Sequence, residues 1–335
     1  MPAPERAQRP ILTVTLNPAL DLTTAVPRLE PQHKLRCSAP RYDPGGGGVN
    51  VSRVIAELEG QSVAFVASGG ATGAMLAGML AAAGVRGVYH PVSGETRTSF
   101  TVMEEETGLH YRFVLPGPAQ DETAAEALLA GIVAALPGES AYVVLSGSLL
   151  PGLPPDFYGQ VTRAVQARGA AVILDAHGND LRFALDARPH IIRVNHIEAA
   201  ELSGIANPEA SAHVLSQTLI AQQRAEIVLV SLEEHGTLVT MPQTQFEVHP
   251  PPVAVRSMVG AGDSFVGALT LWLARGAALP EAVRRGVAAA AAAVTTEGTQ
   301  LCQSERVDEL FDATWIKAGT PGDDLVFGRP AAGSG

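Results

Sequence analysis

Short apolar runs alternate with longer amphipathic segments along most of this chain. The short runs are hydrophobic at consecutive positions and rich in Val, Ile and Leu, which is typical of strands buried on both faces of a parallel sheet. Strands are predicted at residues 11–16, 62–67, 142–146, 171–175, 191–194 and 227–231. Helices are predicted at residues 51–58, 73–83, 122–135, 156–167, 210–222, 263–275, 280–296 and 305–315. The alternation predicts an α/β fold in which helices cover both faces of a mostly parallel sheet.

Two pairs of segments break this alternation and have the pattern of β-ribbons. They lie at residues 22–26 with 35–42, and at residues 98–104 with 109–115, where Thr107-Gly108 forms a hairpin turn. We expect a small sheet that projects as a lid over the carboxyl ends of the main strands, where open α/β sheets bind ligands. The predicted organisation is one domain at 11–318, with the lid at about 22–42 and 97–115, and a flexible tail at 319–335 that is rich in Gly and Pro.

Composition narrows the class of protein. The chain has 335 residues, of which 46% are hydrophobic, and its formal net charge of −11 argues against a nucleic-acid partner. We expect no membrane span and no secretion signal, because the apolar segments are short and residues 1–10 are polar. Cys37 and Cys302 lie far apart and in no metal-ligand spacing, so a reducing, cytoplasmic location is predicted.

A glycine-rich turn opens the predicted helix at 263–275. Gly260, Ala261 and Gly262 would leave several backbone N–H groups unpaired at the positive end of the helix dipole, which is an anion site without basic side chains. Asp263 lies beside that site. One interpretation is a general base for phosphoryl transfer to a substrate hydroxyl. The alternative is an ordinary Asp N-cap, and these residues alone do not decide between them.

A second glycine loop, Gly45–Gly48, precedes Asn50 at the start of another predicted helix. Its spacing fits neither the dinucleotide fingerprint nor a P-loop. A loop of this kind lets a ligand approach the backbone closely, and Asn50 offers a donor and an acceptor to sugar hydroxyls. Asp21 follows the first strand and is a candidate for the same ligand. A flexible loop and a turn-stabilising Asp are the structural alternatives.

Positive charge gathers on the predicted lid of this acidic protein, at Lys34, Arg36, Arg97 and Arg112. Such a cluster suits a phosphorylated substrate. Any one of these side chains is also explained as part of a solvated strand face.

Three motifs taken together resemble those of the ribokinase-like (PfkB-type) carbohydrate kinases, and the likeness runs from about residue 11 to 302. The motifs are Asn17-Pro18-Ala19-Leu20-Asp21, the loop Gly45–Asn50, and Gly260-Ala261-Gly262-Asp263. Finer features look like the minor 6-phosphofructokinase branch of that family: residues 34–37, 45–48, 69–73, 111–114 and 298–302.

The resemblance implies a ribokinase-like, Rossmann-type core of three layers with a β lid, and homodimers joined lid to lid. It implies ATP-dependent phosphorylation of the C1 hydroxyl of fructose 6-phosphate, with Mg²⁺ as cofactor and K⁺ as an activator. By position it makes Asp263 the base and the N–H groups of Gly260, Ala261 and Gly262 the anion hole.

The same resemblance implies roles for further residues. Those expected to bind the sugar and its phosphate are Asp21, Gly46, Asn50, Ser148, Lys34, Arg36 and Arg97. Those expected at ATP are Arg193, Asn195, Ser231, Gly236, Ser257, Val259 and Gly298, with Ala293 near the last of these and a monovalent-cation site nearby. Glu198 would organise Mg²⁺ through water, as suits an ion that keeps several waters.

Gly47 bears on the choice of substrate. Fructose-1-phosphate and tagatose-6-phosphate kinases of this family usually carry Lys in this loop, and that Lys is absent here. The 6-phosphofructokinase reading is therefore favoured, with tagatose-6-phosphate and fructose-1-phosphate kinases as alternatives. A different class of alternative is a catalytically impaired sensor of sugar phosphate or nucleotide.

Four positions depart from the family pattern. Arg193 stands in place of Lys, Met258 in place of Thr, and Glu59 and Glu233 in place of Gly. Gly60 is expected to compensate for Glu59 by a one-residue shift. A carboxylate at residue 233 would weaken ATP binding unless it points to solvent. The prediction is an active enzyme with altered ATP affinity.

Overall fold

The computed structural model describes residues 7–296, 298, 300–318 and 326–327. An 11-stranded sheet forms its centre. The strands in spatial order are β15 (Val326–Phe327), β14 (Trp315–Ala318), β13 (Thr244–His249), β12 (Thr237–Met241), β11 (Ile227–Ser231), β10 (Ile191–Asn195), β9 (Ala171–Asp175), β8 (Tyr142–Ser146), β1 (Ile11–Thr15), β4 (Val63–Ser68) and β5 (Arg86–Pro91). From β11 to β5 all neighbours pair in parallel, and from β11 to β15 they pair antiparallel.

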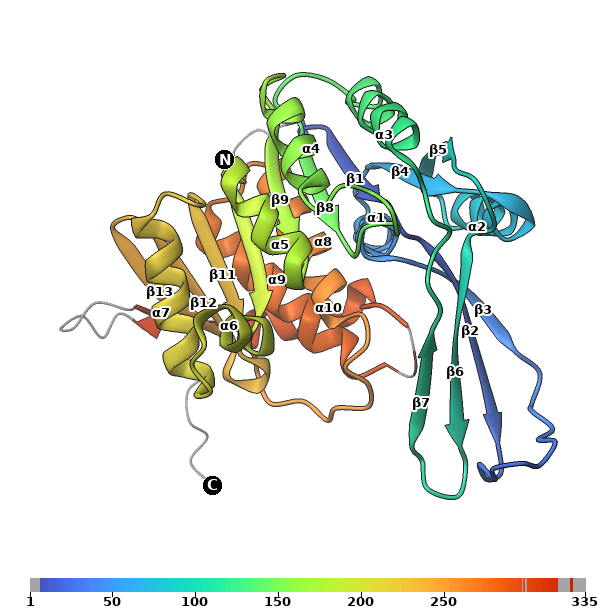
Figure 1. The fold of residues 1–335 in the computed structure, drawn as a ribbon. Coiled ribbons are helices and arrows are strands. Elements are labelled where there is room, and N and C mark those ends of the chain that lie inside the picture. The colour runs from blue at the N-terminus through green and yellow to red at the C-terminus, as the bar shows by residue number, and fades with distance from the viewer. Residues whose placement is uncertain (1–6, 297, 299, 319–325, 328–335) are drawn as a thin grey trace, which may run out of the picture.

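Helices cover both faces of the sheet, so the core has three layers (Figure 1). One face packs against α3 (Glu122–Ala134), α4 (Phe157–Gln166), α5 (Gly178–Ala184), α6 (His196–Ser203) and α7 (Pro208–Ala221). The other packs against α1 (Gly47–Glu57), α2 (Gly70–Ala82), α8 (Ala261–Ala274), α9 (Leu279–Ala293) and α10 (Ser304–Ala313). Side chains of the central parallel strands alternate between the two cores, as Leu12 and Ile11 do, and this explains why these strands read as continuous apolar runs.

A separate four-stranded sheet projects from the core, on the right in Figure 1. Its order is β3 (Arg41–Gly45), β2 (Ala19–Val26), β6 (Arg97–Glu104) and β7 (His110–Val114). The strand predicted at residues 35–42 is wrong in position, because strand structure begins at Arg41. Pro40, which lies inside the predicted range, has no backbone N–H to donate to a strand ladder, and β3 begins directly after it.

The two faces of the small sheet differ in chemistry. Asp43, Asp21, Ser99 and Val114 are register neighbours across the four strands, and they line the cavity described below. The adjacent row is Tyr42, Leu22, Phe100 and Phe113, so it faces the other way. The strand register therefore separates a polar inner face from an apolar outer face.

No helix in the described part of the chain is both long and apolar enough to cross a membrane.

Candidate active site

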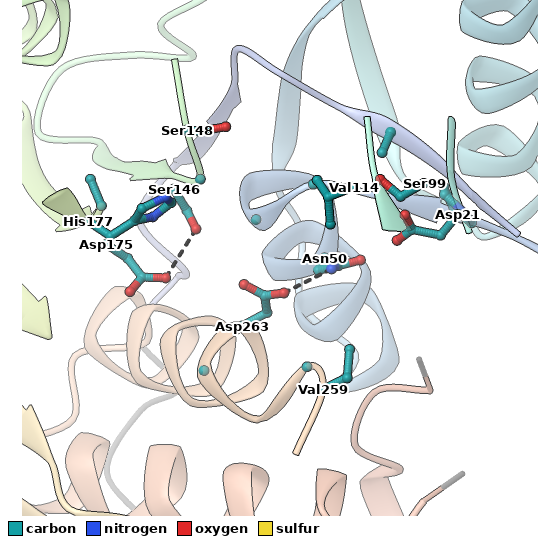
Figure 2. A pocket seen from close by; sticks show the side chains of 18 of the residues that line it. Asp21, Asn50, Ser99, Val114, Ser146, Ser148, Asp175, His177, Val259 and Asp263 are labelled. Atoms are coloured by element: carbon teal, nitrogen blue, oxygen red, sulfur yellow. Dashed lines mark hydrogen bonds between the residues drawn. The ribbon is translucent and has the colours of Figure 1, made fainter. Parts of the chain in front are cut away.

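The carboxyl ends of the parallel strands, the start of α1, the start of α8 and the inner face of the small sheet surround a cavity of about 530 Å³ (Figure 2). Its polar lining side chains are Asp21, Asp43, Asn50, Arg53, Arg97, Ser99, Arg112, Ser146, Ser148, Asp175, His177, Arg193, Glu198 and Asp263. A second cavity of about 800 Å³ shares Arg193, Met258 and Gly262 with it. The apolar residues lining this second cavity include Ile197, Val253, Val255, Phe265, Val287, Ala290, Ala291 and Val294. The polar first cavity suits a sugar phosphate, and the apolar second one suits a nucleotide base.

Asp263 lies in the first turn of α8 and lines the first cavity, directly after Gly262, which borders both cavities. The N-cap of this helix is Gly260, whose φ of 81° is left-handed, and no side chain caps the helix. The interpretation of Asp263 as an N-cap is therefore wrong. Its Oδ2 instead accepts a hydrogen bond from Asn50 Nδ2 at 2.8 Å, across the gap between α1 and α8 (Figure 2).

The surroundings of Asp263 favour a protonatable carboxyl. Burial raises its pKa to about 7, and the negative charge of Asp175 adds to the rise. The hydrogen bond from Asn50 and the charges of Arg193 and Arg112 act in the opposite direction. A carboxyl with this pKa is suited to take a proton from a hydroxyl near neutral pH.

The turn before Asp263 is built for an anion. The first N–H groups of α8 have no partner within the helix, and the helix dipole adds positive potential there. A Cβ at Gly262 would lie 2.9 Å from Arg193 Nη1, so the guanidinium packs directly against the turn. Arg193 thereby adds a full positive charge to the backbone anion site.

Arg193 is held in place by its neighbours in the sheet. Its Nη1 lies 3.3 Å from Asp175 Oδ1 on β9, and its Nε donates to Ser231 Oγ on β11 at 3.3 Å. The side chain is nearly buried and borders both cavities. Arg193 is thus a fixed positive charge at the border of the two cavities.

Asn195 and Glu198 form a capping box at the start of α6. Glu198 Oε2 accepts from the backbone N–H of Asn195 at 2.8 Å, and Asn195 Oδ1 accepts from the N–H of Glu198 at 2.9 Å. Their spacing therefore has a structural reason. Glu198 also lines the first cavity, and burial raises its pKa.

Basic residues on the small sheet face Asp21. Arg97 donates through Nε and Nη2 to Asn17 O and through Nη1 to Leu115 O, which ties the base of this sheet to the core. Burial raises the pKa of Asp21, while the charges of Arg112 and Arg97 lower it. Arg112 lies on β7, at this end of the cavity.

Residues 15–306 match the family described as pfkB family carbohydrate kinase. The chain belongs to the PfkB family. It is an ATP-dependent sugar kinase by that membership. It is 40% identical over 307 residues to the ATP-dependent 6-phosphofructokinase isozyme 2 of Mycobacterium tuberculosis, covering 90% of this chain and 89% of that one. It is 39% identical over 306 residues to the isozyme 2 of Escherichia coli, covering 90% and 97%.

Solved structures agree with this assignment. Phosphofructokinase-2 of E. coli in complex with potassium has a TM-score of 0.86 at 38% identity, and in complex with fructose 6-phosphate a TM-score of 0.84 at 37% identity. Both alignments cover 90% of this chain and 98% of that chain. Arabidopsis ribokinase, 20% identical, has a TM-score of 0.70 over 91% of this chain and 99% of its own, which shows the shared fold. The predicted ribokinase-like α/β fold is confirmed.

The structure brings most residues expected from the PfkB motifs to the two cavities. The first cavity contains Asp21, Gly46, Asn50, Arg97, Ser148, Arg193, Glu198, Val259, Gly260, Gly262 and Asp263. The second contains Arg193, Asn195, Ser231, Gly236, Ala261 and Gly262.

Five expected residues line neither cavity. Ala293 is buried in the core between the sheet and α8–α10. Lys34 and Arg36 are exposed on the loop between β2 and β3. Ser257 and Gly298 lie behind the anion turn: Ser257 Oγ donates to Gly298 O at 2.8 Å and accepts from the N–H of Val259 at 3.2 Å. These two residues brace the turn that leads to Gly260.

The motifs did not single out Arg53, Asp175 or Arg112 as site residues. Asp175 is the last residue of a predicted strand, where α/β proteins place functional groups, so its position was a usable signal. Arg112 was visible as one of the lid cations. Arg53 carried no signal, because a charged residue within a helical pattern normally faces solvent.

The structure shows the backbone or the surroundings of three residues that depart from the PfkB pattern, Glu59, Glu233 and Met258. Glu59 and Glu233 adopt φ of 57° and 52°, the left-handed region that favours Gly, which is the family residue at both positions. The expected shift to Gly60 is wrong: Glu59 itself takes the left-handed conformation, and a Cβ at Gly60 would lie 2.4 Å from Leu271 Cδ1. Glu233 borders the second cavity, with Oε1 3.9 Å from His196 Nε2. Met258 is 52% exposed between the two cavities.

Proposed function

We propose that this PfkB kinase is a 6-phosphofructokinase, which transfers the γ-phosphate of ATP to the C1 hydroxyl of fructose 6-phosphate. The observation that carries the proposal is the position of Asp263 and the anion turn between a polar cavity and an apolar one. A sugar hydroxyl in the first cavity and a triphosphate entering from the second would meet at this carboxylate.

The transfer follows from the groups at that point. Asp263 accepts the proton of the C1 hydroxyl while the hydroxyl oxygen bonds to the γ-phosphorus. The bond from this phosphorus to the bridging oxygen of ADP breaks. The N–H groups of Ala261 and Gly262 stabilise negative charge on the transferring group. Arg193, whose guanidinium packs against the same turn, adds electrostatic stabilisation there.

Glu198 fits a role in holding Mg²⁺ through water. It faces the first cavity, and one of its oxygens is occupied by the capping box. Among the described residues, no group of three or more His, Cys, Asp or Glu side chains could hold a metal. A single carboxylate, that of Glu198, fits Mg²⁺, which commonly binds through one carboxylate, waters and substrate phosphates. When bound, Mg²⁺ neutralises phosphate charge.

A potassium activator would act near Ser257 and Gly298, beside the turn they brace. The proposal draws on the potassium complex of the E. coli relative. Stabilising that turn would keep Gly260 in its left-handed conformation and the N–H groups of α8 aligned.

The phosphorylated end of the substrate would lie on the small sheet. Arg112 and Arg97 provide positive charge at that end of the first cavity, with Asp21 placed for sugar hydroxyls. A Cβ at Gly47 would lie 2.1 Å from Ser146 Oγ, so a Lys at this position requires Ser146 to move. These features support a sugar carrying phosphate at C6 and a free hydroxyl at C1.

An ADP-release assay with Mg²⁺ and K⁺ tests the proposal, with fructose 6-phosphate, tagatose 6-phosphate, fructose 1-phosphate and ribose compared side by side. We expect the highest kcat/KM with fructose 6-phosphate. A higher value with tagatose 6-phosphate or fructose 1-phosphate would reassign the substrate. No turnover on any sugar, with binding still seen by calorimetry, would favour the sensor alternative.

We also propose a homodimer formed through the outer face of the small sheet. Phe113 is 44% exposed, Tyr42 is 38% exposed, and Phe100 stacks on Phe113 at 4.7 Å between ring centroids. A contiguous apolar row across four strands is unusual on a monomer and suits a partner sheet of the same kind. The cytoplasmic location stays a prediction from the sequence.

A further inference from the structure

A chain of hydrogen bonds leads from α1 to the proposed base. Arg53 Nη1 donates to Asn50 Oδ1 at 3.1 Å and to the backbone carbonyl of Pro44 at 2.9 Å. Asn50 Nδ2 in turn donates to Asp263 Oδ2 at 2.8 Å. The amide of Asn50 is therefore held between a cation and a carboxylate.

The chemistry of these three groups permits one orientation of the amide. Arginine has only donors, so the atom facing Arg53 must be the amide oxygen. An ionised Asp263 has only acceptors, so the atom facing it must be the amide nitrogen. The opposite orientation would place two donors together on one side and two oxygens together on the other.

The helices fix the geometry of this chain. Asn50 and Arg53 are three residues apart on α1 and so lie on the same face of the helix. α1 approaches α8 closely at Gly267, where a Cβ would lie 2.6 Å from Val54 Cγ1. Arg53 is itself largely buried, and the negative charges that act on it are, in order of strength, Asp43, Asp21 and Asp263. It is therefore a fixed group and not a mobile surface cation.

We propose that Arg53 is a positioning residue for phosphoryl transfer: it fixes the amide of Asn50 so that Nδ2 faces Asp263 and keeps the base ionised. The inference rests on the proposed role of Asp263. It adds a residue that acts on the base through a second side chain.

Several charges act on Asp263 besides this chain. Asp175 on β9 raises its pKa, and Arg193 on β10 and Arg112 on β7 lower it. Arg53 also interacts with Asp263 directly as a charge. A test must therefore separate the orientation of Asn50 from the charge of Arg53.

The test is a double-mutant cycle with Arg53→Met and Asn50→Ala. In each protein the titration of Asp263 is followed by ¹³C NMR of labelled Asp carboxyls, assigned with Asp263→Asn, and kcat is measured against pH. In the protein that keeps Asn50, Arg53→Met should raise the pKa of Asp263 by about half a pH unit or more, which lowers kcat at pH 6 about threefold. In the Asn50→Ala background the same substitution should move it by less than half as much. Arg53→Lys, which keeps a donor and the charge, should largely restore the wild-type profile.

Three results would overturn the inference. An equal shift in both backgrounds would mean that Arg53 acts by charge alone. An unmoved titration would mean that Asn50 orients without Arg53. A raised KM for the sugar phosphate with an unchanged pH profile would make Arg53 a substrate contact.

A matched control and an independent readout complete the design. Arg284 also donates to backbone carbonyls, those of Thr314 and Phe311 at 3.0 Å, but it lines neither cavity and is not among the charges that act on Asp263. Arg284→Met should therefore change stability without moving the pKa of Asp263. If the wild-type protein turned over no sugar phosphate, the proposed function would fail. The NMR cycle would still report whether Arg53 acts through Asn50.

Discussion

At the scale of single residues, Asp263 has the most informative surroundings. Its pKa of about 7 is caused first by burial, which is the environment created where α1, α8 and the sheet meet. The sequence identified this residue by its place after Gly-Ala-Gly. It did not reveal the hydrogen bond from Asn50 or the charge of Asp175, because both depend on elements that are distant in sequence.

The pH dependence of turnover should follow Asp263. The base must be ionised to accept a proton, so we expect kcat to rise with pH and to level off above about 7. Stability should change in the opposite direction. The pKa of the folded state lies above the ordinary value of 3.8, so the stability contributed by the protonated form is present below that value and is lost as pH rises through 7. The measurement is the free energy of unfolding of wild type and of Asp263→Asn, obtained by chemical denaturation at pH 5 and at pH 8. If the difference in the free energy of unfolding between the two proteins were equal at the two pH values, the predicted pH dependence would be wrong.

Glu233 has a left-handed backbone conformation, and its carboxylate lies at the second cavity. A left-handed conformation costs an L-residue about 1–2 kcal/mol, and the extra freedom of Gly in the unfolded chain offsets about 0.5–1 kcal/mol of any gain. We therefore expect Glu233→Gly to stabilise the fold by roughly 0.5–1 kcal/mol. Removal of the carboxylate from the second cavity should also lower KM for ATP by roughly two- to tenfold, because one repulsive charge is removed.

Glu59→Gly is the matched control for that variant. Glu59 has the same left-handed backbone but lines neither cavity. Thermal unfolding should show a similar gain in stability, while initial rates against ATP concentration should show an unchanged KM. A lowered KM in both variants would mean that the charge of Glu233 is not the cause.

At the scale of elements, the packing of α1 on α8 sets the distance between Asn50 and Asp263. A Cβ at Gly267 would lie 2.6 Å from Val54 Cγ1 and 3.2 Å from Val51 O. We expect Gly267→Ala to push the helices apart, to destabilise the protein by about 1–3 kcal/mol, and to lower kcat more than it raises KM. Gly78→Ala is the control, since a Cβ there meets nothing within 4 Å. Unchanged kcat in Gly267→Ala would show that the helix spacing does not govern the site.

The buried parallel strands were predictable from sequence because each is apolar on both faces. All those predicted from the apolar pattern are present, from β1 to β11. β5 was missed, since at the sheet edge it is largely exposed and lacks an apolar run. β12 and β13 were missed as well, because Thr237, Thr240 and Gln245 interrupt their apolar pattern.

The part of the candidate site that lies within sequence motifs was predictable from the sequence. The glycine turns, Asp21 and Asp263 are local signals. The displacement of Lys34 and Arg36 from the cavity was not predictable, because it depends on where the loop after β2 leaves the sheet. The contact of Arg193 with Gly262 joins β10 to α8, and no local pattern encodes such a contact.

At the scale of the whole molecule, the apolar outer face of the small sheet should govern assembly. Phe113→Asp places a charge in the proposed interface, so we expect the dimer to weaken by about a hundredfold or more in sedimentation velocity. Phe183→Asp is the control, because Phe183 is similarly exposed, at 46%, on α5. A Phe113→Asp protein that sediments as the wild-type dimer would contradict the proposed interface.

Phosphoryl transfer by the proposed mechanism depends on one carboxylate, that of Asp263. The most direct test is the single-turnover rate of phosphoryl transfer from ATP to fructose 6-phosphate in wild type and in Asp263→Asn, with sugar binding measured separately by calorimetry. We predict a rate lower by about 10²–10⁴-fold in the variant, with the affinity for fructose 6-phosphate nearly unchanged. A variant that transfers phosphate at the wild-type rate would contradict the role of Asp263 as the base.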